Sequence, residues 1–179
     1  MNALIDILII LLLAWGFMRY LGPILVTFVV THPDAVPPKR AYGRPACFDL
    51  TAIESKPIPP GEWRTIETGI AYAPWPHIYI KRWNLTLTPF GNVAYKLYTR
   101  SGMAIKKGIR AHLGVIDNDY RETISVVLFN HNPKNSIYVK AGERVGQVEF
   151  YRVPSVWFFQ VSELAPSQRG TKGMGSSGK

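Results

Sequence analysis

The chain of 179 residues is poor in cysteine and in charged residues. Its single cysteine, Cys47, excludes an internal disulfide framework and a cysteine-rich zinc site. The four histidines show no close metal-ligand spacing such as HxxxH. Charged residues make up 18% and apolar residues 47%, which excludes a disordered polyelectrolyte. The length predicts one globular domain with a modest appendage, because it is too short for two full domains.

Basic residues outnumber acidic ones, 21 against 12, for a formal charge of +9. This balance indicates a polyanionic partner, which can be nucleic acid, a phosphate-rich small molecule or anionic lipid. Aromatic and basic residues interleave over 79–83 and 95–100, a pattern that can stack bases and hold phosphates. The same alternation is typical of a sheet with one solvated and one buried face, so no direct nucleic-acid binding is expected.

A long uncharged run, ILIILLLAWGFM, occupies residues 7–18 near the N-terminus. A membrane helix needs roughly 20 apolar residues, a length that residues 3–22 reach with Asp6 at the headgroup level. Pro23 ends this helix, and Lys and Arg follow rather than precede the run. We therefore predict that residues 1–22 form a hydrophobic transmembrane helix that anchors the main domain on the cytoplasmic side. The alternatives are a helix buried against a partner, an upstream start codon included in error, and a soluble cytoplasmic protein.

Beyond Pro23 the sequence shows strand patterns and no convincing helical periodicity. Runs of β-branched and aromatic residues, several of them alternating with polar ones, are separated by turn clusters rich in Pro, Gly, Asn and Asp. These runs cover residues 24–30, 65–73, 79–88, 93–99, 123–130, 136–139 and 144–153. Short strands with this punctuation predict an all-β barrel or sandwich over residues 23–165. Residues 166–179 are rich in Gly and Ser and predict a flexible tail.

The segment GVIDNDYR, residues 114–121, is the most informative stretch. Two β-branched residues precede Asp117 and a strand pattern restarts at Thr123, so Asp117 is predicted at the tip of a β-hairpin. Turn propensity alone explains such a run as an ordinary solvated turn. A carboxylate on a rigid hairpin can also orient and deprotonate a water for attack on phosphorus, and Tyr120 can stack on a sugar or base.

Five separated segments, taken in chain order, resemble the motifs of the trimeric dUTPase family. They are ACFDL (46–50), RSGMA (100–104), GVIDNDYR (114–121), GERVGQ (142–147) and RGTKGMGSSG (169–178). The resemblance runs from about Val26 to Lys179, and the first 22 residues have no counterpart in it. It implies a jelly-roll β-barrel and a homotrimer with three active sites, each built from all three subunits. One chain supplies motifs one, two and four, a second supplies residues 114–121, and a third lends residues 166–179 as a C-terminal active-site arm.

The resemblance also implies the reaction, which is hydrolysis of dUTP to dUMP and diphosphate with Mg²⁺ on the triphosphate, limiting uracil incorporation into DNA. Asp117 is then the general base that directs water at the α-phosphorus. Tyr120 stacks under the deoxyribose and leaves no room for a ribose 2′-hydroxyl. The uracil edge is bound by backbone groups in the stretch that includes Ala111, Gly114 and Ile116.

The remaining implied roles concern the phosphates and the metal. Phosphate oxygens are held by Arg100, Ser101, Gly102 and Gln147. Asp49 supports the hydrated Mg²⁺ indirectly, through water. The arm closes on the nucleotide through Arg169, Gly173, Met174, Gly175, Ser176 and Ser177, with Met174 where the family usually has an aromatic residue over the uracil.

Two other functions stay open on the sequence. A deoxycytidine-nucleotide deaminase shares the fold but is expected to use a Glu as its base, which Asp117 and Tyr120 argue against. A non-catalytic structural or signalling subunit keeps the fold while its N-terminal helix packs into a larger assembly. The intact Asp117, Ser101, Gln147 and Arg169 argue against lost catalysis.

Overall fold

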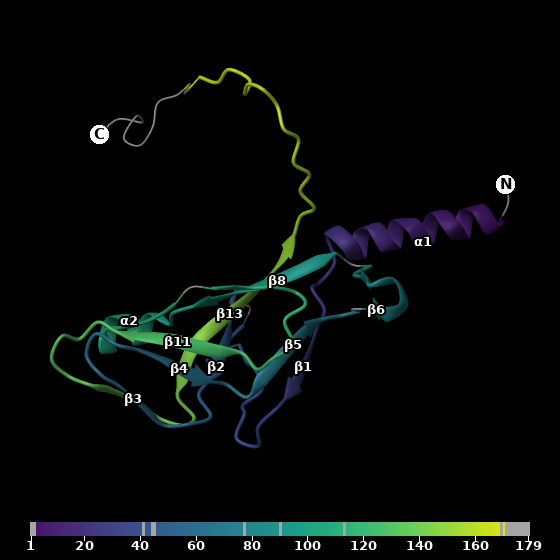
Figure 1. Ribbon diagram of the computed structural model, residues 1–179. Coiled ribbons are helices and arrows are strands. Elements are labelled where there is room, and N and C mark those ends of the chain that lie inside the picture. The colour runs from purple at the N-terminus through teal and green to yellow at the C-terminus, as the bar shows by residue number, and fades with distance from the viewer. Residues whose placement is uncertain are drawn as a thin grey trace.

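The computed structural model describes residues 3–40, 42–43, 46–76, 78–89, 91–112, 114–168 and 170. Within them the chain is mostly β, with two α-helices and one short 3₁₀ helix (Figure 1). The elements are α1 (Ala3–Tyr20), β1 (Val26–Val30), β2 (Phe48–Thr51), β3 (Lys56–Ile58), β4 (Trp63–Glu67), β5 (Ile70–Pro74), β6 (Ile78–Ile80), η1 (Lys81–Trp83), β7 (Leu85–Leu87), β8 (Asn92–Tyr98), α2 (Ser101–Lys107), β9 (Ile109–Ala111), β10 (Val115–Ile116), β11 (Ser125–Asn130), β12 (Ile137–Val139) and β13 (Arg144–Val153). The prediction of an all-β fold is confirmed in this coarse form.

The described strands pair antiparallel into sheets of two to four strands. The largest has the order β10-β8-β13-β2, and a second has the order β4-β11-β9. Three two-stranded sheets, β1-β5, β12-β3 and β6-β7, complete the set. The long strand β13 lies between β8 and β2, so it brings together segments from three distant parts of the sequence.

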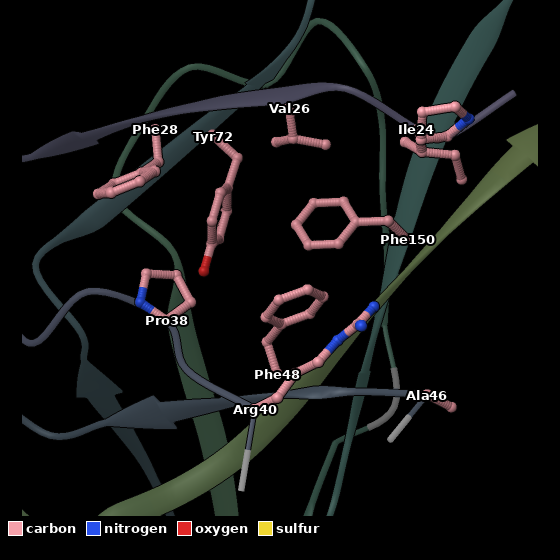
Figure 2. Close-up of a pocket in the computed structure, with 10 residues that line it drawn as sticks. Ile24, Val26, Phe28, Pro38, Arg40, Ala46, Phe48, Tyr72 and Phe150 are labelled. Carbon is pink, nitrogen blue, oxygen red and sulfur yellow. The ribbon is translucent and has the colours of Figure 1, made fainter. Parts of the chain in front are cut away.

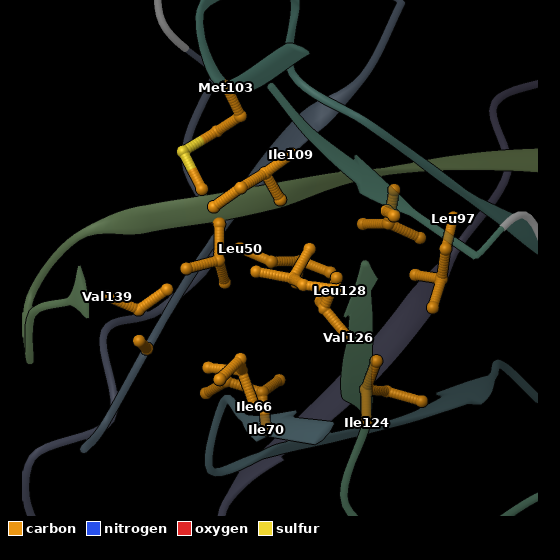
Figure 3. Packing of buried hydrophobic residues seen from close by; sticks show 14 of the residues in the cluster. Leu50, Ile66, Ile70, Leu97, Met103, Ile109, Ile124, Val126, Leu128 and Val139 are labelled. Atoms are coloured by element: carbon orange, nitrogen blue, oxygen red, sulfur yellow. The ribbon is translucent and has the colours of Figure 1, made fainter. Parts of the chain in front are cut away.

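One hydrophobic core lies between these sheets (Figure 3). Along β11 buried and half-buried residues alternate, which places Val126 and Leu128 in the core, as the two-residue period of a strand requires. Leu50 from β2 and Ile66 from β4 pack in the same cluster. Full burial of one such side chain stabilises the fold by about 1.5 to 3 kcal/mol, so these contacts fix how the sheets face each other.

Most predicted strands form where the alternation was clearest. The predicted strand over 144–153 coincides with β13, and that over 93–99 with β8 shifted by one residue. The run over 65–73 is instead two strands, β4 and β5, because Gly69 turns the chain at a φ of +65°. The run over 79–88 is a hairpin of β6 and β7 joined by η1, since Asn84 adopts left-handed backbone geometry.

Helix α2 was not predicted from the sequence. It has seven residues and buries one side chain, Met103, so it leaves no detectable helical periodicity. It ends at Gly108, whose φ of 66° is the left-handed geometry common after helix C-termini. The helix follows directly on β8 and thereby begins at the RSGMA segment.

The predicted N-terminal helix forms as α1, but the prediction that it crosses a membrane is wrong. Across the part of the chain that the structure describes, no helix is both long and apolar enough to span a bilayer.

The C-terminal end of α1 is attached to the β-rich body. Arg152 on β13 donates from Nη2 to the carbonyl oxygens of Met18 at 3.2 Å and Pro23 at 3.3 Å. Arg19 donates to the carbonyl oxygen of Pro89 at 3.3 Å, beyond the end of β7. A guanidinium at a helix C-terminus satisfies carbonyl groups that have no partner within the helix. These contacts place the end of α1 beside the β6-β7 hairpin (Figure 1).

Candidate functional site

Three of the motif segments meet at one end of the four-stranded sheet. Gln147 on β13 pairs with Asp49 on β2 on one side and with Tyr98 on β8 on the other. Arg100 and Ser101 follow Tyr98, where β8 passes into α2. Strand pairing therefore joins motifs one, two and four, which lie far apart in the sequence, in one cluster.

An ion-pair network forms the centre of this cluster. The Asp49 side chain is 12% exposed, and its Oδ1 accepts a hydrogen bond from Arg100 Nε at 2.8 Å. Its Oδ2 accepts one from Arg144 Nη1 at 3.0 Å. Arg100 Nη1 also donates to the carbonyl oxygen of Arg144 at 3.4 Å. Two guanidinium groups against one carboxylate leave an excess positive charge, which favours an anionic ligand here.

Arg144 was missed by the sequence reasoning. It lies within the GERVGQ segment and so carried a signal, but only the ion pair with Asp49 identifies it as part of the cluster. A hollow of about 240 Å³ beside the pair is lined by Lys39, Arg40, Asp49 and Arg144 together with apolar neighbours. Its basic lining agrees with a site for phosphate oxygens.

The other predicted phosphate ligands lie at the same end of the sheet. Ser101 and Gly102 are exposed at the start of α2. Gln147 is half-buried, and its Nε2 donates to the carbonyl oxygen of Thr99 at 3.3 Å, which ties β13 to the end of β8. The structure thus brings Arg100, Ser101, Gly102 and Gln147 to one end of the sheet, and their role in holding phosphate oxygens stays a prediction.

The acidic loop, residues 114–121, forms a second group. Its strand β10 pairs with β8, with Val115 opposite Lys96 and Ile116 opposite Tyr95. The following strand β11 belongs to a different sheet, so the prediction that Asp117 lies at the tip of a β-hairpin is wrong. The turn at Asn118 and Asp119 instead carries the chain from one sheet to the next, since it lies between β10 and β11, which have different partners.

Asp117 and Tyr120 face an open hollow of about 660 Å³. Asp117 is exposed, and Tyr120 is 39% exposed with its hydroxyl 3.5 Å from the carbonyl oxygen of Thr123. Arg121 Nη1 donates to the carbonyl oxygens of Asn118 at 2.6 Å and Tyr120 at 2.9 Å, which holds the turn in shape. An accessible carboxylate next to an aromatic ring suits a ligand with a reactive ester and a flat or ring-shaped part.

The backbone groups predicted to bind a uracil edge already make hydrogen bonds within the chain. The N–H of Ala111 donates to Thr99 Oγ1 at 2.7 Å, and the carbonyl oxygen of Gly114 accepts from the N–H of Leu97 at 3.1 Å. Ile116 lies in the β10-β8 ladder. Thr99, which the sequence reasoning did not single out, therefore holds the backbone at Ala111 in place. The role of Ala111, Gly114 and Ile116 in base recognition stays a prediction.

Within one chain the two groups lie apart. Residue 117 is one step beyond Ile116, which pairs with Tyr95, and Asn118 Nδ2 donates to Asn92 Oδ1 at 3.3 Å. The acidic turn therefore lies toward the start of β8, whereas Arg100 follows its end. The path between them along β8 covers about 20 Å at about 3.3 Å per residue. A single chain does not bring Asp117 next to Ser101.

A third hollow, of about 490 Å³, is apolar and contains none of the predicted site residues (Figure 2). Phe28, Phe48 and Phe150 line it, and the hydroxyl of the buried Tyr72 points into it. Burial raises the pKa of Tyr72, and among the described residues its hydroxyl has no hydrogen-bond partner. This lining does not suit a triphosphate, so the charged cluster and the acidic loop are the better candidates.

Six predicted arm residues lie outside the described residues: Arg169, Gly173, Met174, Gly175, Ser176 and Ser177. The predicted metal site also receives no direct support. No group of three His, Cys, Asp or Glu side chains that could hold a metal ion occurs among the residues the structure describes. Both oxygens of Asp49 accept hydrogen bonds from arginines, and its indirect support of hydrated Mg²⁺ through water stays a prediction.

Comparisons with known proteins agree with this geometry. The dUTPase sequence family matches residues 85–178. Deoxyuridine 5′-triphosphate nucleotidohydrolase of Corynebacterium glutamicum is 36% identical over 144 residues, which cover 79% of this chain and 87% of that protein. A mutant of Staphylococcus bacteriophage 80alpha dUTPase with dUpNHpp has the same fold, with a TM-score of 0.70 at 21% identity over 87% of this chain and 99% of the other. A mutant dUTPase from phage phi11 of S. aureus, described with a structural Mg(II) ion, gives a TM-score of 0.64 at 17% identity over 78% and 97%. The chain therefore belongs to the dUTPase family.

Proposed function

We propose that this protein hydrolyses dUTP to dUMP and diphosphate by attack of water on the α-phosphate. Its relative in Corynebacterium glutamicum bears the name of that activity and matches most of both chains. The observation that carries the proposal is the exposed Asp117 carboxylate beside Tyr120 at the mouth of a hollow large enough for a nucleoside. Asp117 acts as the general base that takes a proton from the attacking water.

The charged cluster binds the triphosphate. Arg100 and Arg144 supply charge-assisted N–H donors, while Ser101, Gly102 and Gln147 supply neutral ones at the same end of the sheet. Donors that are already fixed before substrate binds are the main means by which enzymes stabilise charge developing on phosphate oxygens. The excess positive charge of this cluster agrees with the basic balance of the whole chain.

The active unit is a homotrimer, and each barrel is of the jelly-roll type that the family resemblance implies. The proposal is supported by the separation of Asp117 from Ser101 along β8, because a second chain is needed to bring a carboxylate to the phosphate cluster. Residues 23–165 form the catalytic domain, and residues 166–179 act as an arm that closes on the nucleotide of a neighbouring site. Residues 1–22 are a separate N-terminal helical segment.

Mg²⁺ enters this proposal with the substrate. Phosphate oxygens are hard ligands of the kind Mg²⁺ prefers, and the bound ion neutralises charge on the diphosphate leaving group. The chain's own residues then bind and orient the nucleotide and hold the proton that leaves the water.

A substrate panel tests the proposed reaction. Purified protein is supplied with dUTP, dCTP and UTP in the presence of Mg²⁺, and release of diphosphate and of ammonia is measured for each nucleotide. We expect diphosphate from dUTP alone, since Tyr120 is predicted to exclude the 2′-hydroxyl of UTP. Ammonia from dCTP would instead identify a deaminase, and no turnover of any nucleotide would favour the non-catalytic alternative.

A further inference from the structure

We propose that Asp49 is a positioning residue that clamps Arg100 and Arg144 in place for the triphosphate. This inference rests on the proposed function, because it assigns the clamp to the triphosphate end of the same site. It also makes Arg144 a functional residue.

The clamp is a complete two-sided contact. Each carboxylate oxygen of Asp49 has its own guanidinium partner, Arg100 Nε at 2.8 Å and Arg144 Nη1 at 3.0 Å. The carboxylate is 12% exposed, whereas the Arg144 side chain is 52% exposed and so reaches the solvent side of the pair. The anion is therefore the enclosed member of the network and the arginines form its outer surface.

Three strands hold the carboxylate in this place. Asp49 pairs with Gln147 in the β2-β13 ladder, and its N–H donates to the carbonyl oxygen of Lys39 at 3.0 Å. Arg144 is the first residue of β13. A register shift between Arg144 and Gly146 separates Arg144 from the regular part of the β2-β13 ladder. Arg100 follows β8 on the other side of β13. The clamp thus ties together the three strand ends that carry motifs one, two and four.

A water-mediated contact with hydrated Mg²⁺ is compatible with these contacts. A carboxylate has about four acceptor sites on its two oxygens, and each arginine uses one site on one oxygen. The clamp therefore concerns the orientation of the arginines and not the placement of the cation.

The benefit to the reaction is preorganisation. A guanidinium has five N–H donors in a planar fork, and the contacts of Arg100 with Asp49 and with the Arg144 carbonyl oxygen engage two of them. These two contacts set the plane of the fork before the triphosphate arrives. Phosphate oxygens then meet donors that are already ordered, which lowers the entropic cost of binding.

A double-mutant cycle in the full-length protein tests the clamp, with Asp49→Asn, Arg144→Gln and the double variant. We expect each single variant to raise the KM for dUTP about tenfold or more, with a smaller change in kcat. The KM of the double variant should be about the same as that of the more impaired single variant. Glu54→Gln, which removes a charge from an exposed pair with Lys56, is the control and leaves KM unchanged.

The opposite pattern, in which the effects of the two single substitutions multiply in the double variant, would overturn the clamp. A second measurement does not depend on turnover, so it tests the clamp even if a variant folds poorly or the wild type does not hydrolyse dUTP. Binding of inorganic triphosphate without Mg²⁺ is measured by calorimetry for wild type, Arg144→Gln and Asp49→Asn. Weaker binding in both variants supports the clamp even if dUTP hydrolysis fails, and unchanged binding refutes it.

Discussion

At the scale of single residues, the chemical roles of the motif residues could be inferred from the sequence more readily than the partners of their side chains. The types and order of Arg100, Ser101, Asp117 and Gln147 were enough to indicate phosphate binding and a carboxylate base, since each motif places a given group at a given turn or strand end. The partners of these groups were not predictable. That Asp49 faces two arginines depends on the register between β2 and β13.

Asp117 is the residue whose removal has the largest expected effect. Asp117→Asn keeps the size and the hydrogen-bonding capacity of the side chain but removes the base, so we expect kcat for dUTP to fall about 10²- to 10⁴-fold. Release of diphosphate in a steady-state assay measures this. Asp34→Asn removes a carboxylate at an exposed position that lines neither the hollow at Asp117 nor the charged cluster, and it serves as the control. Equal losses in the two variants would indicate a general electrostatic effect and contradict the role of Asp117.

Tyr95 predicts a pH dependence of stability. It is 1% exposed, its hydroxyl has no hydrogen-bond partner among the described residues, and burial foremost raises its pKa to about 12. Below pH 10 the hydroxyl is protonated in both the folded and the unfolded chain. Above pH 10 only the unfolded chain loses the proton, so this group lowers the unfolding free energy by about 1.4 kcal/mol per pH unit up to pH 12.

Tyr95→Phe is therefore expected to flatten the loss of stability above pH 10 and to leave stability at pH 7 equal or higher. Urea unfolding midpoints at pH 7, 10 and 11 measure the difference. Tyr138→Phe, at an exposed position, is the control and should follow wild type. A Tyr95→Phe variant whose midpoint falls in parallel with wild type would rule out this assignment.

At the scale of elements, the hydrophobic pattern of the sequence predicted where strands occur better than it predicted where they begin and end. β13 matched its predicted range because its ten residues are rich in strand formers, although its burial does not alternate strictly and a register shift lies between Arg144 and Gly146. β4 and β5 were predicted as one strand because Gly69, which lies between them, does not interrupt the hydrophobic pattern. α2 was missed because one buried side chain in seven residues gives no period.

Gly69 tests how strictly the turn between β4 and β5 is specified. Its φ is +65°, and an added Cβ would lie 2.7 Å from the Ala35 Cβ and 2.9 Å from the His32 Cβ. We expect Gly69→Ala to destabilise the protein by about 1 to 3 kcal/mol, from backbone strain together with the steric clash. Gly61→Ala is matched in φ, at +69°, but meets no atom within 4 Å, so strain alone should cost about 1 kcal/mol. If the two variants lower the unfolding temperature equally, the structure around Gly69 relaxes and the clash adds no cost.

At the scale of the whole molecule, the arrangement of the acidic loop decides how the site is assembled. β10 pairs with β8 and not with the next strand in the chain, which turns Asp117 away from Arg100. If the site is complete only between chains, activity depends on the trimer. Light scattering should then give a particle of about three times the chain mass of 20.2 kDa.

Mixed trimers provide a direct test of shared sites. Asp117→Asn and Arg100→Gln are each expected to abolish most activity alone, and co-expression of the two should restore it. If Asp117 and Arg100 at one site come from different chains, about a quarter of the sites in a random mixture contain both wild-type residues. Co-expression of two differently tagged Asp117→Asn chains is the control. A mixture no more active than its parents would show that each chain builds its own site.

The sequence by itself determined the class of fold and the family, because these depend on local period and on short motifs. It also predicted a membrane-spanning helix, which is wrong, since no helix among the described residues is long and apolar enough to span a bilayer. Only the tertiary structure decided which strands are neighbours, since many pairings satisfy the same alternation and burial selects one. That choice places Arg144 and Asp49 together, and it sends the acidic loop to the far end of β8.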